Sequence, residues 1–422
     1  MRQRVFGSGT KMLVLCVLLL AFTICLGHAL AAEETIRILG TVPMTGEAGN
    51  LGPAYDRAMR LAVKDINEAG IKGFSKIEYK LIDTETKPSV MERKLLREIE
   101  TWKPDIAGGA ALETTIRVSC EGGPRYNLPM FVGGHMGTTK YVPPGEVPVS
   151  KWVNYYGYAE FFAGWAAGEF FHELGLEKVA LVAGDYDWGY GCGIGMKAYW
   201  EEHGRPFEID PVIYTALDKT DFSTEVSILK AAKPDGLFCP YMGEGWFSFP
   251  KQLRDADARP EVFLYCPTYS NIGGAIVTGE YGAENIYTLA DHDPTSPGWI
   301  EFVRKWKDAY GEKAFPEAYS NNHYQLIWWI KTVFENAGTK DPDKFIETAR
   351  KTSFQNVCIS PMGPVCDYGS NLGAKGSIVK FVPGASPIHP DFGLHEELVK
   401  VFTTPRMDLI EVLDMMKTIE KL

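Results

Sequence analysis

Apolar and polar residues follow two regular patterns along most of the chain. Short apolar runs, such as 35–42 and 178–184, have the length and composition of buried strands. Between them lie longer segments in which apolar residues recur every three or four positions, the spacing of one helix face. Because strand and helix patterns alternate, we predict an α/β protein with parallel sheets covered by helices.

The alternation divides into two series, one on each side of the segment 151–157. The first series predicts strands at 35–42, 76–83, 105–109 and 129–133 and helices at 53–68, 89–101 and 114–126. The second predicts helices at 158–174, 190–203, 221–233 and 245–257 and strands at 178–184, 210–215, 236–240 and 262–266. Three more helices are expected at 298–310, 317–337 and 341–352, and an amphipathic helix within 401–422.

The first 31 residues differ from the rest of the chain. Three basic residues precede an apolar run at 12–26, which is short for a membrane span. Ala29-Leu30-Ala31 then supplies small residues for cleavage. We therefore predict a signal peptide at 1–31, cleavage near Ala31 and a mature chain that works in the periplasm.

The charge balance limits the partners of the mature chain. The sequence has 54 acidic and 43 basic residues, and without the three basic leader residues the balance is 54 against 40, or −14. An acidic chain without a basic run argues against nucleic acid and against anionic membrane surfaces. A hydrophobic content of 45% is ample for two cores.

Six cysteines remain after the leader, an even number in an oxidising compartment. Cys358 and Cys366 flank a short loop and are candidates for a local disulfide. Cys239 and Cys266 end two successive predicted strands and pair if those strands are neighbours. Cys120 and Cys192 are equally compatible with buried free thiols. The spacings do not match structural zinc, so we expect no metal site.

Motifs of catalysis are absent from the sequence. The glycine-rich stretch 189–195 fails the dinucleotide fingerprint, because Ile194 or Met196 stands where the third glycine is required. The sequence has no Gly-x-Ser-x-Gly elbow, paired-histidine zinc helix or phosphate-binding loop. Asp291-His292-Asp293 has metal-ligand chemistry, but we do not expect it to bind a metal. We expect no enzyme activity and no cofactor.

The first supersecondary unit resembles a known family. A strand at 35–42, the loop 43–50, a helix that ends in Asp65-Ile66-Asn67-Glu68-Ala69-Gly70 and a strand with an acidic end are similar to the start of periplasmic binding proteins of the leucine/isoleucine/valine-binding type. The resemblance implies two doubly wound parallel-sheet lobes around a hinged cleft, joined by three crossing segments at 151–157, near 289–293 and around 354–362. Lobe one would hold 32–152 and about 290–355, and lobe two 153–289 and about 356–400.

The resemblance also implies a function. Proteins of this type are the extracytoplasmic solute-binding components of ABC importers, and they deliver a small solute to a membrane permease and its ATPase. We therefore expect a monomer that binds a small molecule. The alternative is a ligand-sensing module that reports the solute to a receptor or kinase, which would use the same cleft.

Ligands of doubly wound sheets bind beyond the carboxyl ends of the strands, where helix N-termini offer free N–H groups. Candidate binding residues in these loops of lobe one are Asn50, Glu113, Thr114, Thr115, Gly134, His135 and Met136. From the first crossing and lobe two, the candidates are Tyr155, Tyr156, Trp188, Tyr241, Met242, Thr268 and Tyr269. Aromatic walls suit an apolar or flat ligand. The family holds an amino-acid carboxylate with hydroxyl groups in the loops around Thr114 and Met136.

One departure from the family bears on the ligand. Amino-acid binders of this type pair the ligand ammonium with an acid at the position where Thr268 stands here. An unpaired ammonium in a closed cleft is costly. Either Glu244, Asp187 or Glu113 replaces that acid, or the ligand is an organic acid, an aromatic acid or an amide rather than an α-amino acid.

Overall fold

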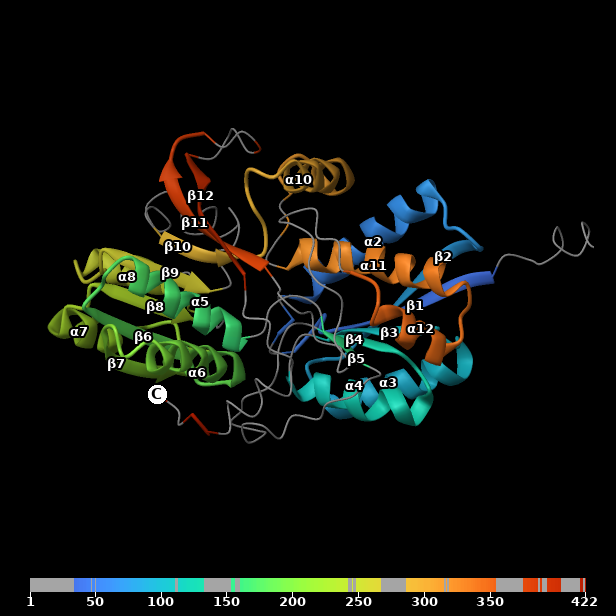
Figure 1. Ribbon diagram of the computed structural model, residues 1–422, viewed down its shortest axis with the longest axis horizontal. Helices are drawn as coiled ribbons and strands as arrows, with labels where there is room; N and C mark the ends of the chain where they lie inside the picture. Colours follow the sequence, from blue (N-terminus) through green and yellow to red (C-terminus); the bar gives the residue numbers. More distant parts are fainter. Residues whose placement is uncertain are drawn as a thin grey trace, which may run out of the picture.

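The strands of this computed structural model form two sheets in two lobes (Figure 1). One sheet has five strands in the order β2-β1-β3-β4-β5, and the other has seven in the order β12-β11-β10-β9-β8-β6-β7. The predicted two-lobed α/β architecture is confirmed. The structure describes residues 34–46, 48–49, 51–110, 113–132, 153–155, 160–241, 245, 248–266, 286–314, 316, 319–353, 375–385, 388, 393–403, 418–419 and 422.

Lobe one is built on a parallel sheet. Its strands are β1 (Glu34–Val42), β2 (Phe74–Asp83), β3 (Ile106–Ala110), β4 (Met130–Val132) and β5 (Val153–Tyr155). Its helices are α2 (Gly52–Ala69), α3 (Pro88–Thr101), α4 (Glu113–Tyr126), α11 (Ser320–Ala337) and α12 (Pro342–Ala349). Helices α2 and α11 lie on one side of the sheet, and α3 and α4 on the other (Figure 1). Strand β5 lies in the predicted crossing segment, where Tyr155 pairs with Val132.

Lobe two has a mixed sheet. The parallel strands are β6 (Lys178–Gly184), β7 (Glu208–Thr215), β8 (Gly236–Pro240), β9 (Val262–Cys266) and β10 (Ile286–Ala290). Its helices are α5 (Glu160–Glu173), α6 (Asp187–Glu202), α7 (Ser223–Ala232) and α8 (Ser248–Asp255). An antiparallel hairpin that we did not predict, β11 (Lys375–Pro383) and β12 (Leu394–Thr403), extends the sheet beyond β10. Helix α10 (Pro297–Tyr310) connects β10 to lobe one.

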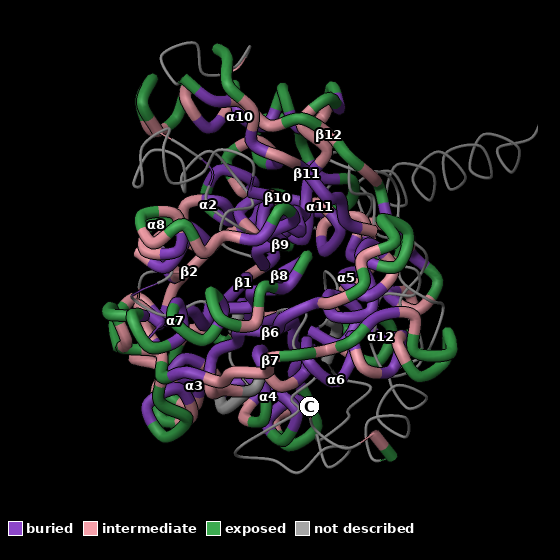
Figure 2. The backbone as a smooth tube through the Cα atoms, turned by 90° about the vertical axis from the view of Figure 1, so that its left-hand side faces the viewer, coloured by how far each residue is buried: buried purple, intermediate pink, exposed green. Residues whose placement is uncertain are grey.

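The central strands of lobe two are buried on both faces. Every residue of β8 and β9 is buried, which explains their continuous apolar sequence (Figure 2). One face packs with α5 and α6 in a core cluster that continues into lobe one. The other face packs against α7 and α8 in a separate cluster. Among the described residues, no helix has both the length and the apolarity required to cross a bilayer.

Helices α5 and α6 approach each other closely at glycines. A Cβ at Gly195 would lie 1.9 Å from the carbonyl oxygen of Phe161, and one at Gly164 would lie 1.9 Å from that of Cys192. Both obstacles are backbone atoms, which cannot move without shifting a whole helix. The two glycines therefore fix α6 against α5.

We expect Gly195→Ala to lower the free energy of unfolding by about 1–3 kcal/mol, because the added methyl forces the helices apart. Urea denaturation of both proteins measures the difference. Gly122→Ala in α4 is the control, because its Cβ would meet side chains rather than backbone: the ring of Tyr126 at 3.3 Å and Cδ2 of Leu95 at 3.9 Å. Equal losses in the two variants would contradict this account.

Candidate functional site

The carboxyl ends of the lobe-one strands face lobe two. Strand β1, in blue, begins at the outer end of its lobe and runs toward the centre of the molecule (Figure 1). The other strands of this sheet are parallel to β1, so their carboxyl ends share one edge. This edge, and the corresponding edge of lobe two, is where ligands of doubly wound sheets bind.

Asp83, at the end of β2, holds the loop that follows β1. Its carboxylate accepts hydrogen bonds from Met44 N at 2.9 Å, Thr45 N at 3.2 Å, Thr45 Oγ1 at 2.7 Å and Glu85 N at 2.9 Å. Burial raises the pKa of Asp83, but these hydrogen bonds outweigh burial and hold it below its usual value. The backbone donors of Met44 and Thr45 are thus occupied by the protein itself.

The end of β3 requires glycine. Gly108 and Gly109 have φ angles of +155° and +106°, in the region that side chains disfavour. A Cβ at Gly108 would lie 1.9 Å from the carbonyl oxygen of Phe131 on β4. The candidate loop before α4 therefore begins from a backbone conformation that only glycine adopts readily. Thr115, one of the predicted hydroxyl residues, is 3% exposed.

His323 of α11 packs against this strand end, and we did not predict it. Its ring stacks on Tyr55 with centroids 3.9 Å apart, and its Nδ1 lies 2.8 Å from the carbonyl oxygen of Tyr319. It also makes a hydrogen bond to the backbone of Gly109. Burial lowers the pKa of His323 to about 4 against the opposing effect of these hydrogen bonds. The imidazole is therefore neutral at pH 7.

A second buried histidine lies where the chain leaves lobe two. His292 follows β10, and its Nε2 lies 2.8 Å from Oε2 of Glu396 on β12. Its Nδ1 lies 3.5 Å from Oδ1 of Asp291, and its ring stacks on Trp299 with centroids 3.8 Å apart. Burial by itself lowers the pKa of His292, but the charges and hydrogen bonds of Glu396 and Asp291 raise it to about 9. We call His292, Asp291 and Glu396 the junction cluster.

The junction cluster is connected to lobe one. The side-chain amide of Asn321 donates a hydrogen bond of 2.6 Å to the carbonyl oxygen of Asp291. Asn321 and His323 belong to the first turn of α11, so that turn contacts the end of β10 in lobe two and the end of β3 in lobe one. Tyr319, directly before this turn, has a φ of +63°, an uncommon conformation for a tyrosine that indicates local strain.

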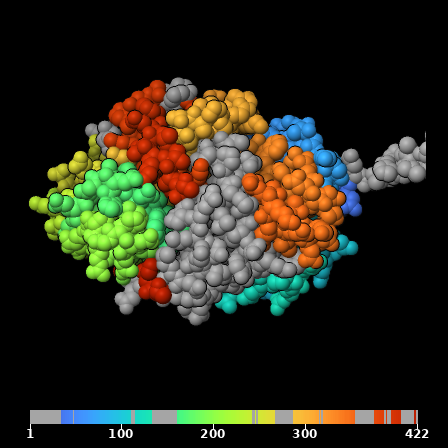
Figure 3. All heavy atoms as spheres, in the orientation of Figure 1, coloured from blue at the N-terminus to red at the C-terminus, as the bar shows by residue number. Residues whose placement is uncertain are grey.

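Helix α10 also bridges the lobes. On the lobe-one side, Lys305 Nζ lies 2.8 Å from Oδ2 of Asp65 on α2, and the Tyr310 hydroxyl donates to the Arg57 carbonyl oxygen at 2.6 Å. On the other side, the red atoms of β11 and β12 adjoin the gold atoms of α10 (Figure 3). Helix α10 thus contacts both lobes.

Two predicted aromatic residues of lobe two are enclosed within it. Trp188 is 1% exposed and belongs to the core cluster under α5 and α6. Tyr241 is also 1% exposed, and its hydroxyl donates to the carbonyl oxygen of Ala216 at 2.8 Å. A neighbouring aromatic pair that we did not predict, Tyr190 and Tyr214, has ring centroids 4.5 Å apart.

The remaining candidates lie wholly or partly outside the described residues. Those wholly outside are Asn50, Gly134, His135, Met136, Tyr156, Met242, Glu244, Thr268, Tyr269, Cys358 and Cys366. For Glu113, Thr114, Tyr155 and Asp187, the structure describes the backbone and not the side chain. Their roles therefore stay predictions.

The suggested Cys239–Cys266 disulfide is wrong. Strands β8 and β9 are neighbours, as the pairing requires, but Cys239 pairs with Tyr265 and Pro240 with Cys266. This one-residue offset directs the two thiols to opposite faces of the sheet. Cys239 accordingly packs under α7 and α8, whereas Cys266 packs under α5 and α6, and both are free.

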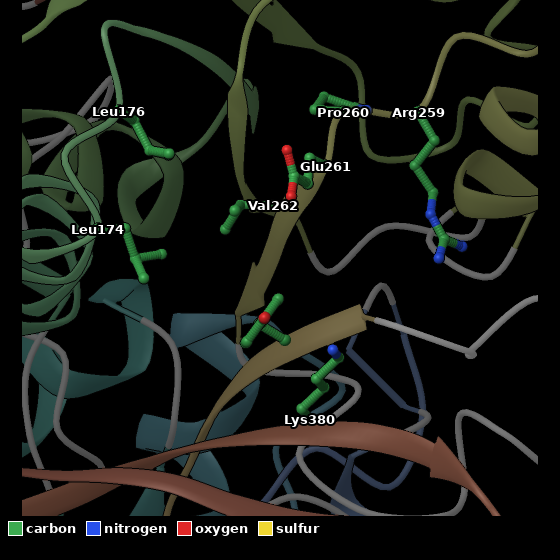
Figure 4. Close-up of a pocket in the computed structure, with 8 residues that line it drawn as sticks. Leu174, Leu176, Arg259, Pro260, Glu261, Val262 and Lys380 are labelled. Carbon is green, nitrogen blue, oxygen red and sulfur yellow. The ribbon is translucent and has the colours of Figure 1, made fainter.

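A surface cavity of about 630 Å³ lies in lobe two at the amino ends of its strands, opposite the candidate ligand loops (Figure 4). Leu174 and Leu176 line one side, and Glu261 and Val262 at the start of β9 line another. Lys380 Nζ lies 5.3 Å from the centroid of the Tyr287 ring. Because this cavity adjoins the amino ends of β9 and β10, it is separate from the candidate ligand loops.

Solved structures share this architecture at low sequence identity. A solute-binding protein of an ABC transporter from Rhodopseudomonas palustris BisB5, in complex with 3,4-dihydroxybenzoic acid, is 20% identical with a TM-score of 0.71, covering 88% of this chain and 98% of that one. Another from R. palustris, in complex with benzoate, is 17% identical with a TM-score of 0.70, covering 89% and 98%. A leucine-binding protein from Thermotoga maritima is 17% identical with a TM-score of 0.67, covering 87% and 98%.

The sequence itself gives the assignment. No curated protein sequence matches the chain. A family model described as periplasmic binding protein matches residues 35–375, which is most of the chain and includes both sheets up to the start of β11. The chain belongs to the periplasmic binding protein family.

Proposed function

We propose that this chain is the extracytoplasmic solute-binding component of an ABC importer and that it captures a small organic or aromatic acid. The observation that carries the proposal is the position of the first turn of α11. This turn contacts the carboxyl ends of strands from both lobes. A solute enclosed at these edges would contact both lobes at once and so favour one relative position of the lobes.

The chemistry of the loops supports a solute without an ammonium group. Thr268 stands where amino-acid binders of this type have an acid. In the loop after β1, Asp83 occupies the backbone donors of Met44 and Thr45. Recognition of a carboxylate therefore depends on two other segments. One is the loop before α4 together with Thr114 in the first turn of that helix, and the other is the loop after β4. Two similar structures contain benzoates, and a third is a leucine-binding protein.

In this mechanism the lobes close around the solute and the closed shape is recognised by the permease. The buried junction cluster and the first turn of α11 would keep the lobes in register while they rotate. The same proposal includes three further points: residues 1–31 are removed, the mature chain works in the periplasm, and it acts as a monomer.

A thermal-shift screen of the mature chain from Ala32 tests the proposal. Benzoate, 3,4-dihydroxybenzoate, aliphatic acids, amides and amino acids are each added in excess. A solute at 100 times its Kd stabilises the folded state by about 2.7 kcal/mol, which raises the Tm by several degrees. We expect the large shift among the acids. A shift with amino acids alone would show that Asp187, Glu113 or Glu244 supplies the missing acid.

Transport and sensing differ in the partner of the loaded protein. We expect the solute-loaded chain to co-purify with a permease and an ATPase from membranes of its own cells. Solute-dependent co-purification with a receptor or kinase, and with no permease, would identify the sensing module instead.

A further inference from the structure

Two histidine rings lie close together where helices α5 and α6 end. His172 lies in the last turn of α5, and His203 directly follows the last residue of α6. Their ring centroids are 6.1 Å apart, with an interplanar angle of 67°. Both residues are exposed to solvent. The two rings therefore form a pair that a dissolved ion can reach, on two helices that Gly164 and Gly195 hold in close contact.

Tyr199 of α6 orients both rings. The His203 ring stacks on the Tyr199 ring with centroids 3.9 Å apart, and its Nδ1 lies 2.8 Å from the carbonyl oxygen of Tyr199. Nδ1 of His172 lies 2.9 Å from the hydroxyl oxygen of Tyr199. A carbonyl oxygen only accepts, so in the neutral ring Nδ1 of His203 carries the proton and Nε2 carries the free lone pair. The same holds for His172 when its Nδ1 donates to the hydroxyl oxygen.

The surroundings of the pair favour a cation. Both helices end here, and the carboxyl end of a helix carries a partial negative charge. Burial, and after it the charges of three carboxylates, raises the pKa of the Tyr199 hydroxyl; these carboxylates belong to Glu169, Glu173 and Glu202. Lys400 offsets part of their charge, since its Nζ lies 3.1 Å from Glu169 and 2.7 Å from Glu173.

We propose that His172 and His203 together bind one divalent transition-metal ion, such as Zn²⁺, Ni²⁺ or Cu²⁺, through their Nε2 atoms. Imidazole nitrogen suits these metals, whereas Mg²⁺ and Ca²⁺ prefer oxygen ligands. With metal–nitrogen bonds of about 2.0–2.1 Å, two imidazoles on one ion have ring centroids roughly 5–6.5 Å apart, a range that includes the spacing observed here. Among the described residues, no group of three histidine, cysteine or carboxylate side chains could hold a metal ion. Water molecules therefore complete the coordination.

The site is separate from the candidate ligand loops. Four residues separate the end of α5 from the start of β6, and five separate the end of α6 from the start of β7. The pair thus lies toward the amino ends of these strands, whereas the ligand loops follow the carboxyl ends. A bound ion joins the ends of α5 and α6 and stabilises lobe two. The cysteine spacings, from which we predicted no metal site, do not bear on two histidines that lie 31 residues apart in the sequence.

Calorimetric titration of the untagged mature chain with Ni²⁺, without any solute, tests the proposal. We expect saturable binding of one ion at the pair and no heat with Mg²⁺. His172→Ala and His203→Ala should each weaken Ni²⁺ binding by about 100-fold or more, because each leaves a single imidazole in place of a chelating pair. His395→Ala on β12 is the matched control, which removes another histidine and should bind Ni²⁺ as the native protein does. No binding, or equal affinity in His172→Ala and His395→Ala, would overturn the proposal.

Electron paramagnetic resonance of the protein with one equivalent of Cu²⁺ identifies the ligands independently of affinity. We expect hyperfine splitting from two imidazole nitrogens in the native protein and from one in His172→Ala and in His203→Ala. A spectrum with one nitrogen ligand or none in the native protein, or with two in both variants, would overturn the assignment. Neither experiment contains a solute, so the result does not depend on the proposed transport function.

Discussion

Replacement of His292 by alanine is expected to lower the free energy of unfolding by about 3–5 kcal/mol, because it leaves two buried carboxylates without their cation. The side chains of Asp291 and Glu396 are both 5% exposed. Within the described residues, Oδ2 of Asp291 and Oε1 of Glu396 have no hydrogen-bond partner, so His292 is their main compensation. The variant also loses the stacking of His292 on Trp299.

Urea denaturation at pH 6 measures this loss under conditions in which His292 is charged. His172→Ala is the matched control, because His172 is exposed and makes one hydrogen bond of 2.9 Å, to Tyr199. We expect the control to lose no more than about 1 kcal/mol. A loss as small for His292→Ala as for His172→Ala would show that the junction cluster contributes no net stability.

The stability of the native protein is expected to fall by about 3 kcal/mol between pH 6.5 and pH 9. The pKa of His292 is about 9 in the folded protein and 6.5 in the unfolded chain. Because the folded state holds the proton more tightly, the stabilisation is fully present below pH 6.5. It is lost as the pH rises through the folded pKa of about 9, where His292 loses its charge between Asp291 and Glu396.

Denaturation of the native protein and of His292→Gln across this pH range isolates the effect. Glutamine fills part of the same space and cannot be protonated, so its curve should lack the fall. Other groups titrate equally in both proteins and cancel in the difference. Parallel curves for the two proteins would mean that His292 is neutral in the folded state.

The regular elements were predictable because their packing is reflected in local sequence. Strands β8 and β9 match the predicted ranges 236–240 and 262–266, since both are apolar runs buried on two faces. Short or half-exposed strands were not predictable. Strand β5 has three residues, and β12 is an edge strand in which half-buried and exposed positions interrupt the apolar pattern.

The junction was only partly predictable, because its contacts join residues far apart in the sequence. The sequence located Asp291-His292 at a crossing, but nothing local connects His292 with Glu396, which lies 104 residues later. His323 gave one signal, the polar run Ser320-Asn321-Asn322-His323 at the start of a helix that continues into the apolar run 326–330. Its contact with Gly109 follows only from the packing of α11 near the end of β3.

Titration calorimetry of the mature chain with benzoate, 3,4-dihydroxybenzoate and leucine tests the central claim most directly. The account predicts saturable, one-to-one binding of at least one acid that lacks an ammonium group, with a Kd of about 1 µM or tighter, or −8.2 kcal/mol. It predicts weaker binding of leucine. Tight binding of leucine together with no heat from either acid would contradict the account and would require an acidic partner for the ammonium in the cleft.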